Sequence, residues 1–220
     1  MLEKIIADYN ESIIDTDREQ ALEVVNNALK GGISPEDIVF KVVSSALKQS
    51  MQTINIQETN LAQHYLTSQI AVEVTEQMIP KFKKLPKIEG RMVIGTAFGD
   101  LHSLGKRIVT GCLTASMIEV SDLGVNVPAE EFVESAIEQN AHIIGVSTMM
   151  VHTAKGENGP SGVRQLLKKQ KLENRIKLIV GGAPYHFDSE LYKVVGADAW
   201  SEDGIKATST IINLIKEVKR

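Results

Sequence analysis

Residues 92–105 read MVIGTAFGDLHSLG and decide the fold. The apolar run Met92–Phe98 predicts a buried strand, and the residues after Gly105 continue as a helix. Asp100 and His102 therefore fall in the turn between the two, at the carboxyl end of a strand. In an open α/β sheet, this edge is where ligands bind.

Five short apolar runs alternate with helical segments in the second part of the chain. Such alternation predicts a parallel sheet covered on both faces, and right-handed crossovers limit it to a doubly wound type, flavodoxin-like or Rossmann-like. The predicted strands are Met92–Phe98, Met117–Val120, Ile143–Ser147, Leu178–Val180 and Ala197–Trp200.

The first 79 residues follow helical spacing instead. Ser34-Pro35-Glu36-Asp37 has an N-cap, a proline at the first helical position and acidic residues in the first turn. Helices are predicted over residues 2–14, 17–30, from 35 onward, and over 61–79, where Leu61, Tyr65, Leu66, Ile70, Val74 and Met78 share a face. We expect a four-helix bundle cap at 1–79, a lysine-rich and proline-containing linker at 80–90, and an α/β domain at 91–220.

Bulk composition excludes several classes of function. The chain has 220 residues, 43% of them hydrophobic, a net charge of −4 and a pI near 5.8. A nucleic-acid partner needs a basic face and is not expected. No signal peptide or membrane span is expected, so the sequence predicts a cytoplasmic protein. The single cysteine, Cys112, is expected to be a buried thiol in a helix.

Three polar or glycine-rich features follow strands that a 2-1-3-4-5 order makes adjacent. They are Asp100 with His102, Ser147-Thr148-Met149, and Gly181-Gly182. A neutral imidazole ligates transition metals, and a carboxylate on its other nitrogen sets its basicity. Two glycines admit a flat, bulky ligand close to the backbone. Taken singly, each feature also fits an ordinary cap or turn.

Other ligand-binding motifs do not fit these residues. Gly95, Gly99 and Gly105 have the wrong spacing for a dinucleotide fingerprint, and no P-loop is present. A phosphoacceptor receiver domain needs an aspartate at the end of strand 3, where Ser147 stands.

The three features resemble the motifs of corrinoid proteins from methyltransferase systems. These proteins are in turn similar to the cobalamin-binding region of methionine synthase. That family carries Asp-x-His-x-x-Gly, Ser-x-Leu and Gly-Gly, which correspond here to Asp100–Gly105, Ser147–Met149 and Gly181-Gly182. Gly124–Pro128 and Gly196–Ala199 extend the resemblance, and the helical segment matches the family's cap. The resemblance implies a bound cobalamin with these contacts: Asp100, His102, Ser103, Leu104, Gly105, Ser147, Met149, Thr153, Gly181, Gly182, Gly196 and Ala197.

The resemblance also implies roles. His102 would be the lower axial ligand of cobalt, and Asp100 and Thr153 would form a proton-linked relay behind it. Ser147 would hydrogen-bond the displaced benzimidazole, for which Gly181 and Gly182 leave room.

The sequence departs from the family at several positions. Met149 replaces the usual leucine, a volume-conserving exchange, and Ser103 replaces a frequent aspartate. Residues 60–66, NLAQHYL, replace a Phe-Leu-Pro stretch over the upper face of the cofactor. His64 in this stretch is expected to be solvated, as are His142, His152 and His186.

By this resemblance the chain is a methyl carrier rather than a complete enzyme. A substrate-specific methyltransferase would deliver a methyl group to Co(I) cobalamin, and a second methyltransferase would pass it from methyl-Co(III) to a pterin or thiol, with a reductive activator as a further partner. Methanol, methylamines, aryl methyl ethers and quaternary amines stay open as donors. The alternatives are a cobalamin-dependent sensor or regulator, the small subunit of an adenosylcobalamin mutase, and an α/β domain without cobalamin.

Overall fold

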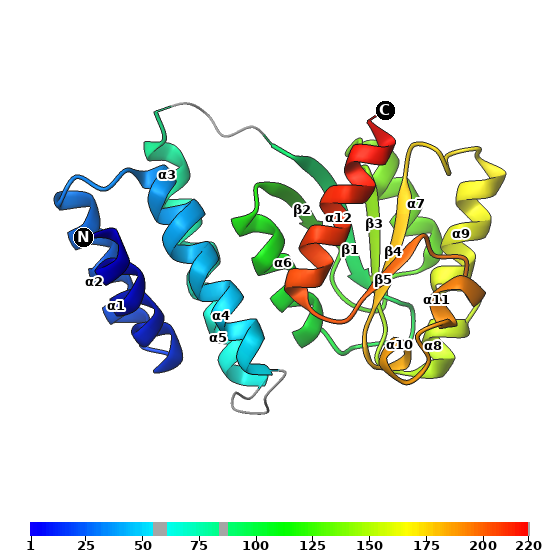
Figure 1. The fold of residues 1–220 in the computed structure, drawn as a ribbon. Helices are drawn as coiled ribbons and strands as arrows, with labels where there is room; N and C mark the ends of the chain where they lie inside the picture. The colour runs from blue at the N-terminus through cyan, green and yellow to red at the C-terminus, as the bar shows by residue number, and fades with distance from the viewer. Residues whose placement is uncertain (55–60, 84–87, 220) are drawn as a thin grey trace. The chain divides into compact units, whose positions relative to one another are not determined.

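The computed structural model describes residues 1–54, 61–83 and 88–219 (Figure 1). The chain divides into two compact units. One unit comprises residues 1–87 with 111–117, and the other comprises residues 88–110 with 118–220. Within the described residues, no helix is long and apolar enough to cross a membrane.

The first unit is helical, as the sequence predicts. α3, η1 and α4 follow one another directly, so they form the third predicted helix. The elements are α1 (Leu2–Ile14), α2 (Arg18–Lys30), α3 (Pro35–Asp37), η1 (Ile38–Val43), α4 (Ser44–Ile54), α5 (Leu61–Met78) and η2 (Ile79–Lys81).

The predicted start signals are confirmed. The hydroxyl of Ser34 accepts a hydrogen bond from the amide of Asp37 (3.1 Å), which caps α3, and Pro35 opens that helix. Asp17 caps α2 in the same way through the amide of Gln20 (2.9 Å).

Two details of the helical unit differ from the prediction. η1 is a π-helical segment rather than part of a regular α-helix. Its apolar residues Ile38, Val39, Val42 and Val43 are all fully buried, so their packing stabilises the departure from α-helical geometry. Leu66 was expected on the buried face of α5 but is 43% exposed, because the core of that helix is Ile70, Val74 and Met78.

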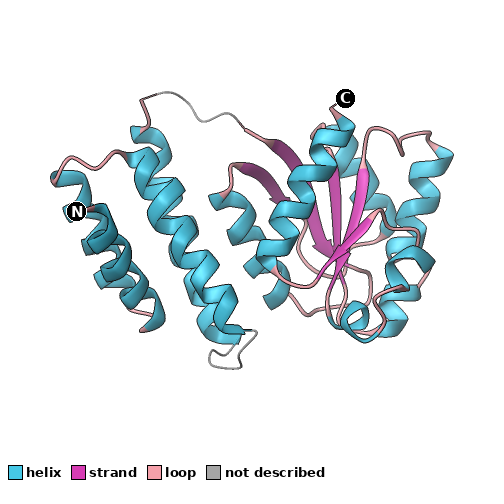
Figure 2. Cartoon of the chain, viewed as in Figure 1, coloured by secondary structure: helices cyan, strands magenta, loops and turns pink. Residues whose placement is uncertain are grey.

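The second unit is built on a parallel sheet of order β2-β1-β3-β4-β5, which Figure 2 shows in magenta, and this confirms the predicted doubly wound fold. In the described part of the chain it has five strands. They are β1 (Gly90–Thr96), β2 (Ile118–Asp122), β3 (Ile143–Ser147), β4 (Lys177–Gly181) and β5 (Ala199–Ser201).

Helices cover the sheet. α7 and α9 supply Phe132, Val133 and Leu167 to one buried layer, where they pack against Val93, Ile144 and Leu178 of the sheet. α12 packs against β3, β4 and β5. The helices of this part of the chain are α6 (Leu104–Ala115), α7 (Ala129–Glu138), α8 (Val151–Lys155), α9 (Pro160–Lys169), α10 (Ala183–Phe187), α11 (Leu191–Val194) and α12 (Gly204–Val218). Cys112, in α6, is buried as predicted.

The register aligns the carboxyl ends of four strands. Thr96 pairs with Ser147, Ser147 with Gly181, and Gly181 with Ser201. The loops that follow these residues therefore leave the same edge of the sheet, which is where the sequence predicts a site.

Candidate functional site

Asp100 lies at the centre of the loops that leave this edge, and its side chain is completely buried. One carboxylate oxygen, Oδ1, faces the Nδ1 atom of His102 (2.9 Å) and accepts the backbone amide of the same residue (3.0 Å). The other oxygen, Oδ2, accepts the amide of Met149 (2.6 Å) and the hydroxyl of Thr153 (3.1 Å). Asp100 thus joins the loop after β1 to the segment after β3.

The same contacts determine the charge of the carboxyl group. Burial raises the pKa of Asp100, but the hydrogen bonds from Met149, His102 and Thr153 together outweigh it and lower the pKa below its ordinary value. The group is therefore an anion at neutral pH. An anionic carboxylate only accepts hydrogen bonds, so Nδ1 of His102 carries the proton.

In the neutral imidazole with Nδ1 protonated, the other nitrogen, Nε2, is the one with a lone pair. The His102 side chain is 56% exposed, and the structure gives Nε2 no partner among the described residues. A neutral, oriented imidazole with a free Nε2 can bind a metal ion.

A second set of contacts holds the loop that carries these residues. The hydroxyl of Thr96 donates to the carbonyl of Asp100 (2.7 Å), which also accepts the amide of Asn126 (3.0 Å). The Asn126 side-chain oxygen accepts the amide of Gly99 (2.7 Å). Asn126 adopts a left-handed conformation (φ 59°), which asparagine tolerates better than most residues. We call Thr96 and Asn126 the loop clamp. Sequence analysis missed its function, although Asn126 lies in the motif Gly124–Pro128.

Lys106 on α6 is also buried and was not predicted. Its ammonium group pairs with Asp122 at the end of β2. Asp122 also accepts the amide of Gly124 (2.8 Å), so this pair orders the turn that leads to Asn126.

Of the residues predicted to bind a cofactor, most lie at this edge. Ser147 ends β3, and its carbonyl accepts the amide of Ala97 (3.0 Å). Ser103 and Leu104 are half-buried at the start of α6, and a Cβ atom on Gly105 would meet nothing within 4 Å. Gly182 adopts φ 113°, and a Cβ atom there would lie 1.9 Å from the carbonyl of Thr148, so only glycine fits.

Gly196 and Ala197 are not brought together with the other predicted residues. They precede β5, so they lie at the amino ends of the strands, whereas the Asp100 loop lies at the carboxyl ends. The carbonyl of Gly196 accepts Nε of Arg164, and Arg164 also binds Asp198. Gly196 and Ala197 therefore contribute to a separate polar network.

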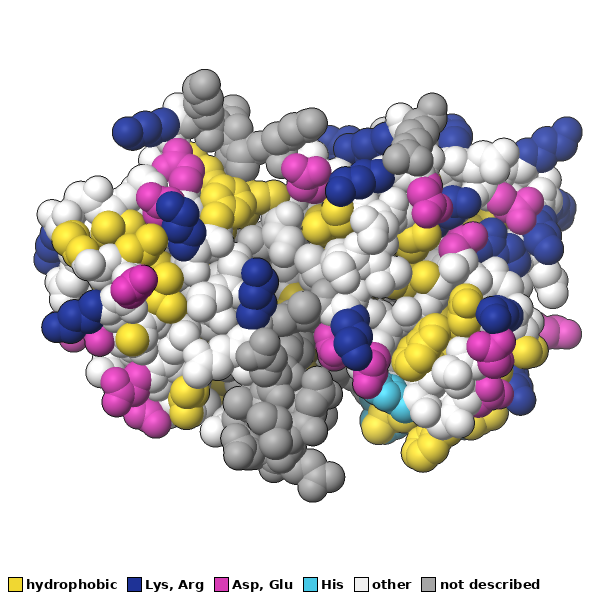
Figure 3. Space-filling view, in the orientation of Figure 1, with side chains coloured by type: hydrophobic (Ala, Val, Ile, Leu, Met, Phe, Trp, Pro, Cys, Tyr) yellow, Lys and Arg dark blue, Asp and Glu magenta, His cyan; other side chains and the backbone are white. Residues whose placement is uncertain are grey.

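Exposed apolar side chains surround the Asp100 loop. The segments after β1, β3 and β4 expose Phe98, Leu101, Met149, Val151 and Phe187. Figure 3 shows hydrophobic side chains beside a histidine at the lower edge of the sheet unit. His152 and His186 are exposed, as expected. Asn60 and the side chains of Leu61 and His64 lie outside the described residues.

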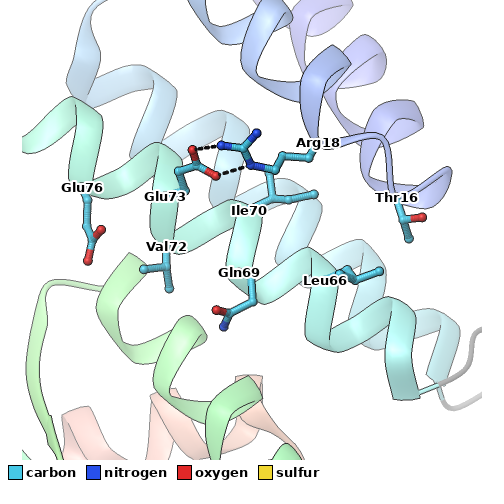
Figure 4. A pocket seen from close by; sticks show the side chains of 8 residues that line it. All are labelled: Thr16, Arg18, Leu66, Gln69, Ile70, Val72, Glu73 and Glu76. Carbon is cyan, nitrogen blue, oxygen red and sulfur yellow. Dashed lines mark hydrogen bonds and ion pairs between the residues drawn. The ribbon is translucent and has the colours of Figure 1, made fainter.

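The helical unit contains a pocket of about 300 Å³ that no predicted site residue lines (Figure 4). Arg18 and Glu73 form an ion pair across it, with Nε 2.7 Å from Oε2. Both charges are thereby already paired. The lining residues are Thr16, Arg18, Leu66, Gln69, Ile70, Val72, Glu73 and Glu76.

Known proteins match this chain over most of its length. The B12 binding domain family matches residues 90–209. The chain is 33% identical to trimethylamine corrinoid protein 1 of Methanosarcina mazei over 213 residues, which cover 95% of this chain and 96% of that protein. It is 30% identical to dimethylamine corrinoid protein 3 of Methanosarcina acetivorans over 219 residues, covering 97% and 98%.

Solved structures share the fold. A cobalamin-binding protein from Desulfitobacterium hafniense superposes with a TM-score of 0.75 at 23% identity, covering 96% of this chain and 98% of that one. A chain of the methanol:cobalamin methyltransferase complex from Methanosarcina barkeri superposes with a TM-score of 0.72 at 21% identity, covering 97% and 80%.

Proposed function

The chain belongs to the B12-binding domain family, and we propose that it carries a methyl group on a bound corrinoid between two methyltransferases. The observation that supports this most directly is the His102 imidazole, which Asp100 orients through Nδ1 and which offers Nε2 outward from a sheet edge. This nitrogen would supply one ligand to a metal that a macrocycle holds.

The residues present fit a corrinoid. Exposed apolar side chains around His102 suit the face of a large ring, and Gly105 leaves open space beside them. A Cβ atom on Gly181 would meet only the carbonyl of Ser201, at 3.6 Å, so this stretch of β4 also leaves room for a ligand. Buried hydroxyls without partners lie next to it.

Cobalt in a bound corrinoid supplies the nucleophile and the position that a methyl group occupies. The protein's residues do the rest. His102 would hold the metal through Nε2, and Asp100 accepts the hydrogen bond from Nδ1 and thereby fixes the tautomer. Thr153 has one hydroxyl proton and two acceptors within reach, Asp100 Oδ2 (3.1 Å) and the carbonyl of Met150 (2.8 Å). It can therefore strengthen or release the hydrogen bond on Asp100.

We assign partners from the relatives. Their names favour a methylated amine as the methyl source, and one structural neighbour is part of a methyltransferase complex. A substrate-specific methyltransferase would load the carrier, and a second one would unload it to a thiol or a reduced pterin. A reductive activator would restore the reactive cobalt state. We keep residues 1–79 as a proposed cap domain, 80–90 as a linker and 91–220 as the corrinoid-binding domain. No observation favours the sensor or mutase alternatives.

Absorbance spectra of the reconstituted protein test the assignment. Wild-type protein with aquocobalamin should show a histidine-ligated Co(III) spectrum, and His102→Ala a spectrum without that ligand. His152→Ala removes an exposed histidine and is the matched control, which should resemble the wild type. Identical spectra for wild type and His102→Ala would contradict the axial role.

A further inference from the structure

Lys106 occupies a position that is costly for a charged side chain. It is 3% exposed and is the third residue of α6, where the positive end of the helix dipole opposes a cation. Removing a charge from water costs free energy that a single ion pair does not fully return. A methionine of similar length would pack here without this penalty. Folding alone therefore does not account for a lysine at this position.

The contacts of Lys106 lead to the turn that follows β2. Its ammonium group donates to Oδ1 of Asp122, and the same oxygen accepts the amide of Gly124 (2.8 Å). An aspartate that accepts the amide two residues further on forms an Asx turn. The Asp122 side chain is 36% exposed, so water competes for its carboxylate. The ammonium group of Lys106 therefore holds this side chain in the turn.

The Asx turn is hydrogen-bonded to the end of β1 and to the loop that follows it. The carbonyl of Gly124 accepts the amide of Thr96 (3.1 Å). Two residues further on, the amide of Asn126 donates to the carbonyl of Asp100 (3.0 Å). A continuous series of hydrogen bonds therefore joins the ammonium group of Lys106 to the loop clamp and to Asp100.

This series of contacts begins and ends beside His102. α6 starts two residues after His102 and carries Lys106 in its first turn, while Asp100 lies two residues before His102. We propose that Lys106 is a positioning residue for His102: its ammonium group holds the Asx turn against the loop clamp, and the clamp keeps the imidazole in place. This inference rests on the proposed function, because His102 is the residue that would hold the metal.

Replacing Lys106 with methionine should separate stability from metal ligation. Methionine fills the space of the lysine stem and removes a buried charge, so the melting temperature of the apoprotein should stay within about 2 °C of the wild type. The amides of Gly124 and Gly99 should nevertheless exchange with deuterium about fivefold faster. After reconstitution with aquocobalamin, the histidine-ligated share of the absorbance spectrum should fall about twofold or more.

Two further variants make the result specific. Lys206 is also the third residue of a helix, α12, and pairs with Glu202, but its side chain is 54% exposed. Lys206→Met is therefore the matched control and should change neither exchange nor ligation. The double variant Lys106→Met with Asp122→Asn is the rescue, because a neutral asparagine is less strongly hydrated and still accepts the Gly124 amide. It should recover about half or more of the lost histidine-ligated share.

The outcomes decide the two proposals separately. An unchanged histidine-ligated share in Lys106→Met, or unchanged exchange at Gly124 and Gly99, overturns the positioning role while the carrier function stands. A melting temperature lowered by more than about 6 °C, without recovery of ligation in the double variant, also overturns it, because the lysine would then be purely structural. Wild-type protein that takes up no cobalamin overturns the proposed function itself.

Discussion

Replacing Asn126 with alanine should loosen the loop that presents His102. The substitution removes the acceptor for the Gly99 amide and places alanine in a left-handed conformation. The lost hydrogen bond should cost about 1 kcal/mol or less, because Gly99 is exposed and water can replace the oxygen. The conformational strain should cost about 1 kcal/mol more. We therefore expect a total destabilisation of about 1 to 2 kcal/mol.

Two further substitutions separate these contributions. Asn140 also has a positive φ (51°), is exposed and lies before β3, away from the Asp100 loop, so Asn140→Ala should show the strain alone, about 1 kcal/mol. Asn126→Asp keeps both the acceptor oxygen and the tolerance for a positive φ, and should be close to wild type. Trp200 fluorescence during urea unfolding reports on the sheet unit in each case.

Amide hydrogen exchange gives the decisive measurement. In Asn126→Ala the Gly99 amide should exchange about fivefold faster than in the wild type, and the histidine-ligated fraction of the reconstituted protein should fall. Asn140→Ala should change neither. Equal destabilisation by the two alanine variants, with unchanged exchange at Gly99, would refute the loop clamp.

Three other results are expected. Gly182→Ala should prevent normal folding of the site, because its Cβ atom would overlap the carbonyl of Thr148, whereas Gly181→Ala should fold normally and weaken corrinoid binding in a fluorescence titration. Asp122→Ala should lower the free energy of unfolding in urea by about 3 kcal/mol, because it leaves the buried Lys106 ammonium unpaired. Lys106→Met should cost less, and the reverse order would contradict a stabilising pair. The raised pKa of Tyr185 should make the free energy of unfolding of the wild type fall as pH rises from about 10 to about 12, because the tyrosine ionises first in the unfolded state. In the same unfolding measurements, Tyr185→Phe should lose less stability over this pH range than Tyr192→Phe does.

The fold could be predicted because its signals are local. Apolar runs of three to seven residues marked the strands, and caps such as Ser34 and Asp17 marked helix starts. The doubly wound type followed from the handedness of crossovers, which is a general rule, and the observed order is one that this type allows. Strand ends were less certain: β1 ends at Thr96, two residues before the apolar run does, because Phe98 leaves the sheet and is 49% exposed.

Apart from Thr153, which the resemblance implied, the contacts that support the site could not be predicted, because they span the sequence. Gly99 and Asn126 are 27 positions apart, and Asp100 and Met149 are 49 apart. Neither contact involves a characteristic pair of residue types, since each joins a side chain to a backbone amide.

The arrangement around Asp100 explains why its motif needs this fold. A carboxylate with no solvent exposure is costly unless its oxygens accept hydrogen bonds. Two of its four donors come from His102, but the other two come from Met149 and Thr153, beyond β3. Pairing of Thr96 with Ser147 brings these segments together. The same Asp-x-His sequence in an isolated loop would lack half of these donors, so it could not keep a buried anion or an oriented imidazole.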